Sequence, residues 1–170
     1  MTDAQSTPAA LIVEAVKRAA VAWVAAGDTE TALWCLWIDD ALYVVCGPGE
    51  QDDPGLDGAD TAGVRLRGDH GGRIVGFTAD VTRVDPAAPE WEGVATALAA
   101  KRLNAPAGDT VARWAAECAV YRLAPHPVPD QAGATLPEGS LAAVPRPSPA
   151  ARPTRKPFRL HRVKRADRRR

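Results

Sequence analysis

The chain has 170 residues, the size of one ordinary domain, so a second full hydrophobic core is not expected. No apolar run is long enough to cross a bilayer and the first residues lack the order of a signal peptide, so we expect a cytoplasmic protein. Three cysteines, an odd number without metal-ligand spacing, predict buried free thiols rather than a disulfide framework or a metal site.

The formal net charge is zero, but the charges are unevenly divided along the chain. The first 125 residues contain 10 Lys and Arg against 18 Asp and Glu, whereas residues 146–170 contain 11 Lys and Arg and a single acid. Prolines recur through the C-terminal segment, which leaves it few apolar groups to bury. The predicted division is a disordered N-terminus (1–9), a folded acidic domain (10–125) and a disordered Pro-rich basic tail (126–170).

The first predicted element is a helix that begins at Thr7-Pro8 and ends at Gly27. Apolar residues recur at helical spacing from Leu11 to Val24 and form a single stripe. The pattern therefore predicts a long helix that lies on a core.

A hairpin is predicted next. The segment TALWCLWI (31–38) is apolar on both alternating faces, which is typical of a strand covered on each side. Asp39-Asp40 interrupts it, and LYVVC (42–46) follows with the β-branched and aromatic residues that favour a sheet. The two predicted faces of the first strand are Leu33, Cys35 and Trp37 on one side, and Trp34, Leu36 and Ile38 on the other.

The segment 47–63 is rich in glycine and acidic residues and is predicted to be the longest loop of the domain. A second hairpin follows, in which 64–67 and 73–85 are strands joined at Gly71-Gly72. The remaining predicted elements are a helix from Pro89 to Arg102, a short helix capped by Asp109 or Thr110, and a closing strand, Cys118 to Leu123, with Pro125 and Pro127 ending the folded part.

This α+β order resembles the pyridoxamine 5'-phosphate oxidase-like, FMN-binding split β-barrel superfamily, of which the chain is identified as a divergent member. The resemblance covers about residues 10–125 and rests on two segments, ALWCLWIDDALYVVCGPG and GGRIVGFTADVTRVD. It implies a small antiparallel split β-barrel with flanking helices. It also implies a homodimer that holds a flavin or deazaflavin at the subunit interface.

The sequence departs from the family where the cofactor phosphate would bind. Flavin-binding members supply basic or hydroxyl groups after the second strand of the first hairpin, whereas GPGEQDDPGLDGAD contains no Lys or Arg, so a phosphate would meet like charge. Arg65, Arg67 and Arg73 are the candidate phosphate-binding cations, and solvated outward side chains are the alternative. Trp37, or Trp34, is a candidate to stack on a planar ligand, and core packing is the alternative.

The family's first barrel strand is also hard to find, which makes a truncated or cofactor-free barrel plausible. His70 is interpreted as a solvated turn residue, and the sequence indicates no catalytic residue and no metal ligand.

Two functions remain open. The first is a split-barrel protein related to flavin-dependent oxidoreductases, with FMN binding that is weak or lost. If it is an enzyme, it is an FMN- or deazaflavin-dependent oxidoreductase. The second is a non-catalytic dimeric adaptor whose basic residues 146–170 bind nucleic acid or an acidic protein. A solubilising tail, an intramolecular cover of the acidic domain and a segment on anionic lipid are further readings of that tail.

Overall fold

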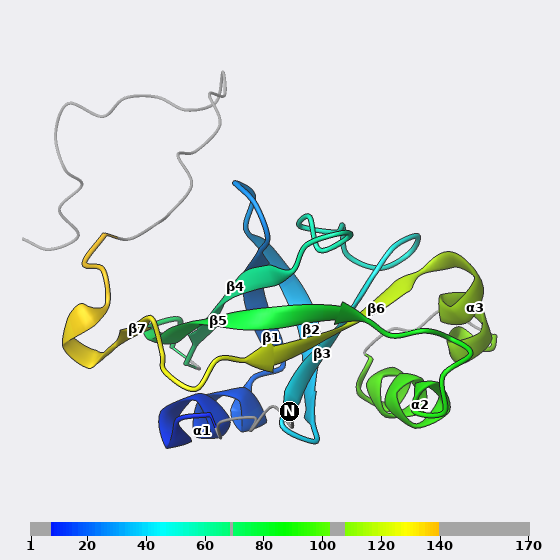
Figure 1. Ribbon diagram of the computed structural model, residues 1–170, viewed down its shortest axis with the longest axis horizontal. Coiled ribbons are helices and arrows are strands. Elements are labelled where there is room, and N and C mark those ends of the chain that lie inside the picture. The colour runs from blue at the N-terminus through cyan, green and yellow to red at the C-terminus, as the bar shows by residue number, and fades with distance from the viewer. Residues whose placement is uncertain (1–7, 69, 103–107, 140–170) are drawn as a thin grey trace, which may run out of the picture. The chain divides into compact units, whose positions relative to one another are not determined.

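The computed structural model describes residues 8–68, 70–102 and 108–139 (Figure 1). The chain divides into two units, Met1–Pro137 and Glu138–Arg170, and the fold given below is that of the first. The predictions for residues 1–7 and for 140–170, which include the basic tail, lie outside the described residues.

Six antiparallel strands form a closed barrel in the order β4-β1-β2-β3-β6-β5, and pairing between β4 and β5 closes it. A short seventh strand pairs with β5 beside Val75 and Gly76. The predicted fold class, a small antiparallel barrel with flanking helices, is confirmed. The strands are β1 (Val21–Ala25), β2 (Thr31–Ile38), β3 (Ala41–Cys46), β4 (Thr61–Arg67), β5 (Arg73–Arg83), β6 (Ala119–Pro125) and β7 (Gln131–Ala132).

The first predicted helix is too long. Helix α1 spans Ala10–Arg18 only, the backbone becomes extended at Ala19, and β1 follows at once. Ala22 and Val24 are buried in β1 while their neighbours face outward, the two-residue alternation of a strand. Pairing with β2 and β4 overrides the helix propensity of the alanines here. The first barrel strand, which was hard to find in the sequence, is therefore present.

The predicted first hairpin is confirmed. Ile38 pairs with Ala41 across a two-residue turn, and Asp39 and Asp40 both have positive φ, 44° and 60°. Positive φ at both central residues is the backbone of a type I′ turn, whose twist matches that of the two strands it joins. Asp is among the residues that tolerate positive φ.

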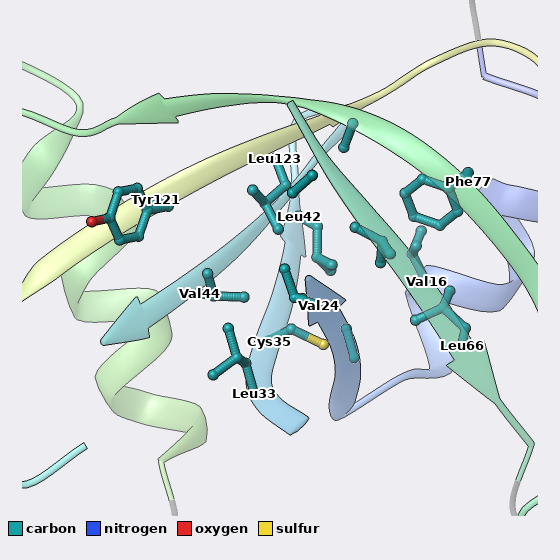
Figure 2. Close-up of a cluster of buried hydrophobic side chains, with 14 of the residues drawn as sticks. Val16, Val24, Leu33, Cys35, Leu42, Val44, Leu66, Phe77, Tyr121 and Leu123 are labelled. Atoms are coloured by element: carbon teal, nitrogen blue, oxygen red, sulfur yellow. The ribbon is translucent and has the colours of Figure 1, made fainter. Parts of the chain in front are cut away.

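The main core fills the barrel interior (Figure 2). Side chains from β1, β2, β3 and β6 point toward one another there, among them Val24, Leu33, Val44 and Leu123. Helix α1 adds two buried side chains, Ile12 and Val16, to this cluster. Of the two predicted faces of β2, the one with Leu33, Cys35 and Trp37 points into the barrel: Leu33 and Cys35 are buried, and Trp37 packs against the same cluster while half-buried.

A second core lies on the outer face of β3. Helices α2 (Trp91–Lys101) and α3 (Thr110–Glu117) lie side by side (Figure 1) and contribute the buried Trp91 and Trp114 to it. Tyr43 and Val45 of β3 face these helices, so every residue of β3 is buried. The predicted Asp109 cap is confirmed, because Asp109 Oδ1 accepts a hydrogen bond from the Ala112 amide at 3.0 Å. The three cysteines are buried and free, as predicted.

The chain continues to contact the barrel beyond Pro125, where the sequence placed the end of the folded part. The His126 amide donates to the Thr78 carbonyl, and the Pro127 carbonyl accepts from the Ala9 amide. Strand β7 and a 3-10 turn (Gly133–Thr135) follow. Proline has no amide to donate, but the residues between the prolines do, and they make these hydrogen bonds.

Candidate functional site

The three predicted phosphate-binding arginines lie on one hairpin. Arg65 and Arg67 are on β4, and Arg73 begins β5 directly opposite Arg67. Arg65 Nη1 is 2.6 Å from Glu30 Oε1, so its charge is already paired. Arg73 Nη1 is buried without a hydrogen-bond partner among the described residues. The structure thus brings the cations together, and only part of their hydrogen-bonding capacity is used.

Trp37 does not join them. It lies on β2 and packs against the barrel interior, on the opposite face of the sheet from Arg65. The aromatic partner is Trp23 of β1, whose ring centroid is 4.7 Å from the guanidinium carbon of Arg67, a cation–π geometry. Trp23 is also the register partner of Arg65. Sequence reasoning missed Trp23 because it was assigned to a helix stripe. The signal that could have identified Trp23 as an outward residue of a strand was its two-residue alternation with Ala22 and Val24.

These residues belong to the outward surface of β1 and its neighbours, which borders α1 at Arg67 and α2 at Trp34. Helix α1 packs on β2 and β5, while α2 and α3 pack on β2, β3 and β6. The outward side chains of β1 and its neighbours include Val21, which is 37% exposed, and the half-buried Trp34 beside it. We call this surface the β1–β4 face, and it comprises Val21, Trp23, Ala32, Trp34, Arg65 and Arg67.

A buried carboxylate, that of Glu50, anchors the acidic loop (residues 47–63). The Glu50 side chain is 0% exposed, and its oxygens accept hydrogen bonds from Arg113 Nη2 at 2.5 Å, Arg102 Nε at 2.7 Å and Trp114 Nε1 at 3.0 Å. Arg113 Nη1 also donates to the Pro48 carbonyl at 2.6 Å. Burial opposes ionisation of Glu50, but the hydrogen bonds from Trp114 and Arg113 and the charge of Arg102 outweigh it. The pKa of Glu50 is therefore held below its usual value.

The Glu50 cluster brings cations to the acidic loop from elsewhere in the chain. Arg102, which directly follows α2, and Arg113 of α3 pair with Glu50 in a loop that carries no cation of its own. Both arginines are engaged with the loop, so they hold it against the helices. No local sequence signal reveals this, because the partners lie far along the chain.

The rest of the loop borders an acidic cleft of about 370 Å³. Asp52, Asp53, Asp57 and Glu117 line it, with Arg83 at the same rim. Asp53 Oδ1 caps a loop turn by accepting from the Leu56 amide, while its Oδ2 accepts from the Tyr121 hydroxyl at 2.9 Å. The expectation that a phosphate would meet like charge beside this loop agrees with the lining of the cleft.

Burial raises the pKa of one hydroxyl and two thiols that line this cleft. Burial, and then the hydrogen bond to Asp53, raise the pKa of Tyr121 above its usual value. Burial, with the nearby Asp53 charge, raises the pKa of the Cys46 thiol to about 12, and burial also raises the pKa of Cys118. Both shifts favour the neutral thiol over the thiolate.

The two described histidines do not line the cleft. His70 is exposed in the β4–β5 turn, as expected, and His126 Nε2 is 2.8 Å from Asp80 Oδ1 on the outside of β5. Among the described residues no three metal-ligating side chains come together. No described helix has the length and apolar character that a membrane span requires.

Comparison with known proteins supports the fold and nothing finer. No protein-family model matches the chain, and no curated protein matches its sequence. The structure is similar to that of HutZ, a heme storage protein from Vibrio cholerae, with a TM-score of 0.52 and 12% identity over 68% of this chain and 87% of that one. It is also similar to a putative 5-nitroimidazole antibiotic resistance protein from Bacteroides thetaiotaomicron (TM-score 0.49, 11% identity, 67% and 77% covered) and to a putative pyridoxamine 5'-phosphate oxidase from Listeria innocua (TM-score 0.44, 15% identity, 71% and 91% covered).

The closed six-stranded antiparallel barrel is thus a fold that this chain shares with HutZ, and the barrel fold expected from the sequence is confirmed.

Proposed function

We propose that this protein is related to flavin-dependent oxidoreductases and that it binds a planar cofactor, FMN, weakly on the β1–β4 face. The observation that carries the proposal is the contact of Arg67 with Trp23, next to Arg65 on the outward side of β1 and β4. An indole offers an apolar plane for a ring system to stack on, and guanidinium groups are suited to hydrogen-bond a phosphate in pairs.

The same geometry explains why the proposed binding is weak. Arg65 is already paired with Glu30 at 2.6 Å, so a phosphate has to compete with that carboxylate. The acidic loop has no Lys or Arg, and the two arginines that contact it, Arg102 and Arg113, are engaged with Glu50. Arg67 and Arg73 are therefore the main cations of the proposed site.

A second copy of the chain is the proposed partner of this face. Val21 is an exposed large apolar residue in the centre of it, and Trp34 is half-buried beside it. These two neighbouring apolar side chains are the contact that a partner would cover. We therefore propose a homodimer in which the partner covers the cofactor.

The test is titration of the purified full chain with FMN, followed by quenching of flavin fluorescence, with the visible spectrum of the protein recorded beforehand. We expect Arg67→Gln to weaken FMN binding by roughly tenfold or more, as loss of a charge-assisted hydrogen bond does. Arg83→Gln, which removes an exposed arginine outside this face, is the matched control and is expected to change binding less than twofold. The proposal is wrong if wild-type protein is colourless and ignores FMN, or if the two variants behave alike.

A non-catalytic adaptor is the second candidate function, and one observation favours it. Residues 146–170 contain 11 Lys and Arg and a single acid, a composition that binds polyanions by releasing their counterions. DNA retention measured at increasing salt should then fall with a log–log slope of roughly −0.9 per phosphate contacted. If a chain lacking 146–170 is retained as strongly as the full chain at low salt, the adaptor function is excluded.

A further inference from the structure

A groove of about 360 Å³ lies between helix α1 and the β4–β5 hairpin, away from the acidic cleft. Its apolar wall consists of Leu11, Ala15 and Ala19 from the helix side and Ile74 from β5. Leu11 is 42% exposed, although most other large apolar side chains of the described fold are covered. This volume is within the range of small-molecule sites, which are predominantly apolar with a few polar groups that orient the ligand.

The charged groups of the groove favour an anion. Arg18 and Arg67 both line it, and none of the ion pairs found among the described residues involves either of them. Glu14 is the single acid of the lining. Its Oε1 lies 3.9 Å from Nζ of Lys17, which is on the outside of the same helix. The groove therefore has an apolar wall beside two arginines.

The helix periodicity accounts for this arrangement. Leu11, Glu14, Ala15 and Arg18 are spaced three and four residues apart, so they share one side of α1. Ile12 and Val16 occupy the neighbouring side and fill the barrel. One helix thus closes the barrel with one side and forms the groove with the other, and it ends in the basic residue that faces the groove.

We infer that this groove binds a small amphipathic monocarboxylate, with its aliphatic or aromatic body on Leu11, Ala15 and Ile74 and its carboxylate on Arg18 and Arg67. A bare inorganic anion leaves the apolar wall exposed to water, and a neutral apolar molecule leaves both arginines without an anionic partner. A molecule that satisfies both parts buries apolar surface and gains charge-assisted hydrogen bonds at the same time.

The inference is independent of FMN binding, although Arg67 belongs to both surfaces. Arg18 lines the groove and is absent from the β1–β4 face, so a variant at Arg18 tests the groove alone. Arg67 also contacts Trp23, so a carboxylate that draws Arg67 into the groove should change the environment of that indole.

The experiment uses the full chain and octanoate, kept below its micelle concentration, with 1-octanol as the neutral probe of the same body. Binding is measured by calorimetry and by the Nε1–H resonance of Trp23 in a ¹⁵N-labelled protein, assigned with Trp23→Phe. We expect a Kd for octanoate at or below about 1 mM and binding of 1-octanol at least roughly tenfold weaker.

Three variants separate the groove from nonspecific attraction. Arg18→Gln should weaken octanoate binding by roughly tenfold, whereas Lys17→Gln, one residue earlier on the outside of α1, should change it less than twofold. Ala19→Leu should abolish binding by filling the groove, with an unchanged unfolding transition showing that the fold is intact. The inference is refuted if octanoate and 1-octanol bind equally, if the two charge variants behave alike, or if Ala19→Leu binds as wild type does.

Discussion

Removing the Glu50 carboxylate is the perturbation that tests the structure most directly. Glu50→Ala leaves the Trp114 indole N–H buried and two guanidinium groups without their anion. Breaking a buried ion pair by deleting one partner costs about 3 to 5 kcal/mol. Arg102 and Arg113 remain 16% and 22% exposed, so water can reach them after the deletion. We therefore expect a loss of about 3 kcal/mol, the low end of that range.

Glu50→Gln separates charge from shape. The amide oxygen still accepts a hydrogen bond, but the charge-assisted contribution, about 1.5 kcal/mol, is lost. Urea denaturation followed by tryptophan fluorescence measures both variants. The exposed Glu92 of α2 provides the matched control, since Glu92→Gln should change the free energy of unfolding by less than about 0.5 kcal/mol. A loss under about 1 kcal/mol for Glu50→Ala would refute the proposed anchoring of the loop.

The stabilising contribution of Glu50 also depends on pH. Its folded-state pKa lies below the ordinary value of 4.5, so the contribution is fully present above pH 4.5 and is lost as the pH falls through the folded pKa. The difference in unfolding free energy between wild type and Glu50→Gln should therefore be constant near neutral pH and shrink below about 4.5. A difference that grows on acidification would contradict this sign.

The remaining predictions concern stability and are checked by the same denaturation assay. Trp114→Ala should cost about 3 to 5 kcal/mol because the side chain is fully buried, whereas Trp34→Ala should cost less than half of that because Trp34 is only half-buried. Equal losses would place Trp34 in the core. Asp109→Ala should cost about 1 kcal/mol through loss of the α3 cap, and no measurable change would mean that the cap is dispensable. Gly47→Ala should destabilise, since Gly47 has φ 137° and a new Cβ would lie 3.0 Å from Cys118 Cα, so a neutral result would refute the tight approach.

The fold was predictable wherever a local pattern matched the final environment. The β2–β3 hairpin was found because Asp39-Asp40 separates two apolar runs, and α3 because Asp109 precedes it. The N-terminal helix was overextended because Ala19 and Ala20 are good helix formers, and local sequence does not show that Val21 to Ala25 pairs with β4, on the far side of a long loop.

The candidate site was predictable in its cations but not in its geometry. Arg65, Arg67 and Arg73 were chosen because they are the basic residues nearest the loop, and they do share a hairpin. The stacking residue depends on which β1 side chains point outward, so Trp37 was chosen in place of Trp23 once β1 was taken for a helix. The partners of Glu50 could not be identified, because contacts between the loop and two helices are set by tertiary packing alone.

Strand β3 has a further consequence, because it is buried on both faces and forms the common wall of the barrel core and the helix core. Neither cluster keeps its lining if β3 leaves the sheet, so the two should open as one cooperative unit rather than as separate layers. Amide hydrogen exchange measures this directly: the slowest amides of α2 and of the barrel should share one opening free energy. The barrel and its helices are thus expected to be a single energetic domain with two hydrophobic compartments, in which α2 and α3 contribute to the stability of the barrel.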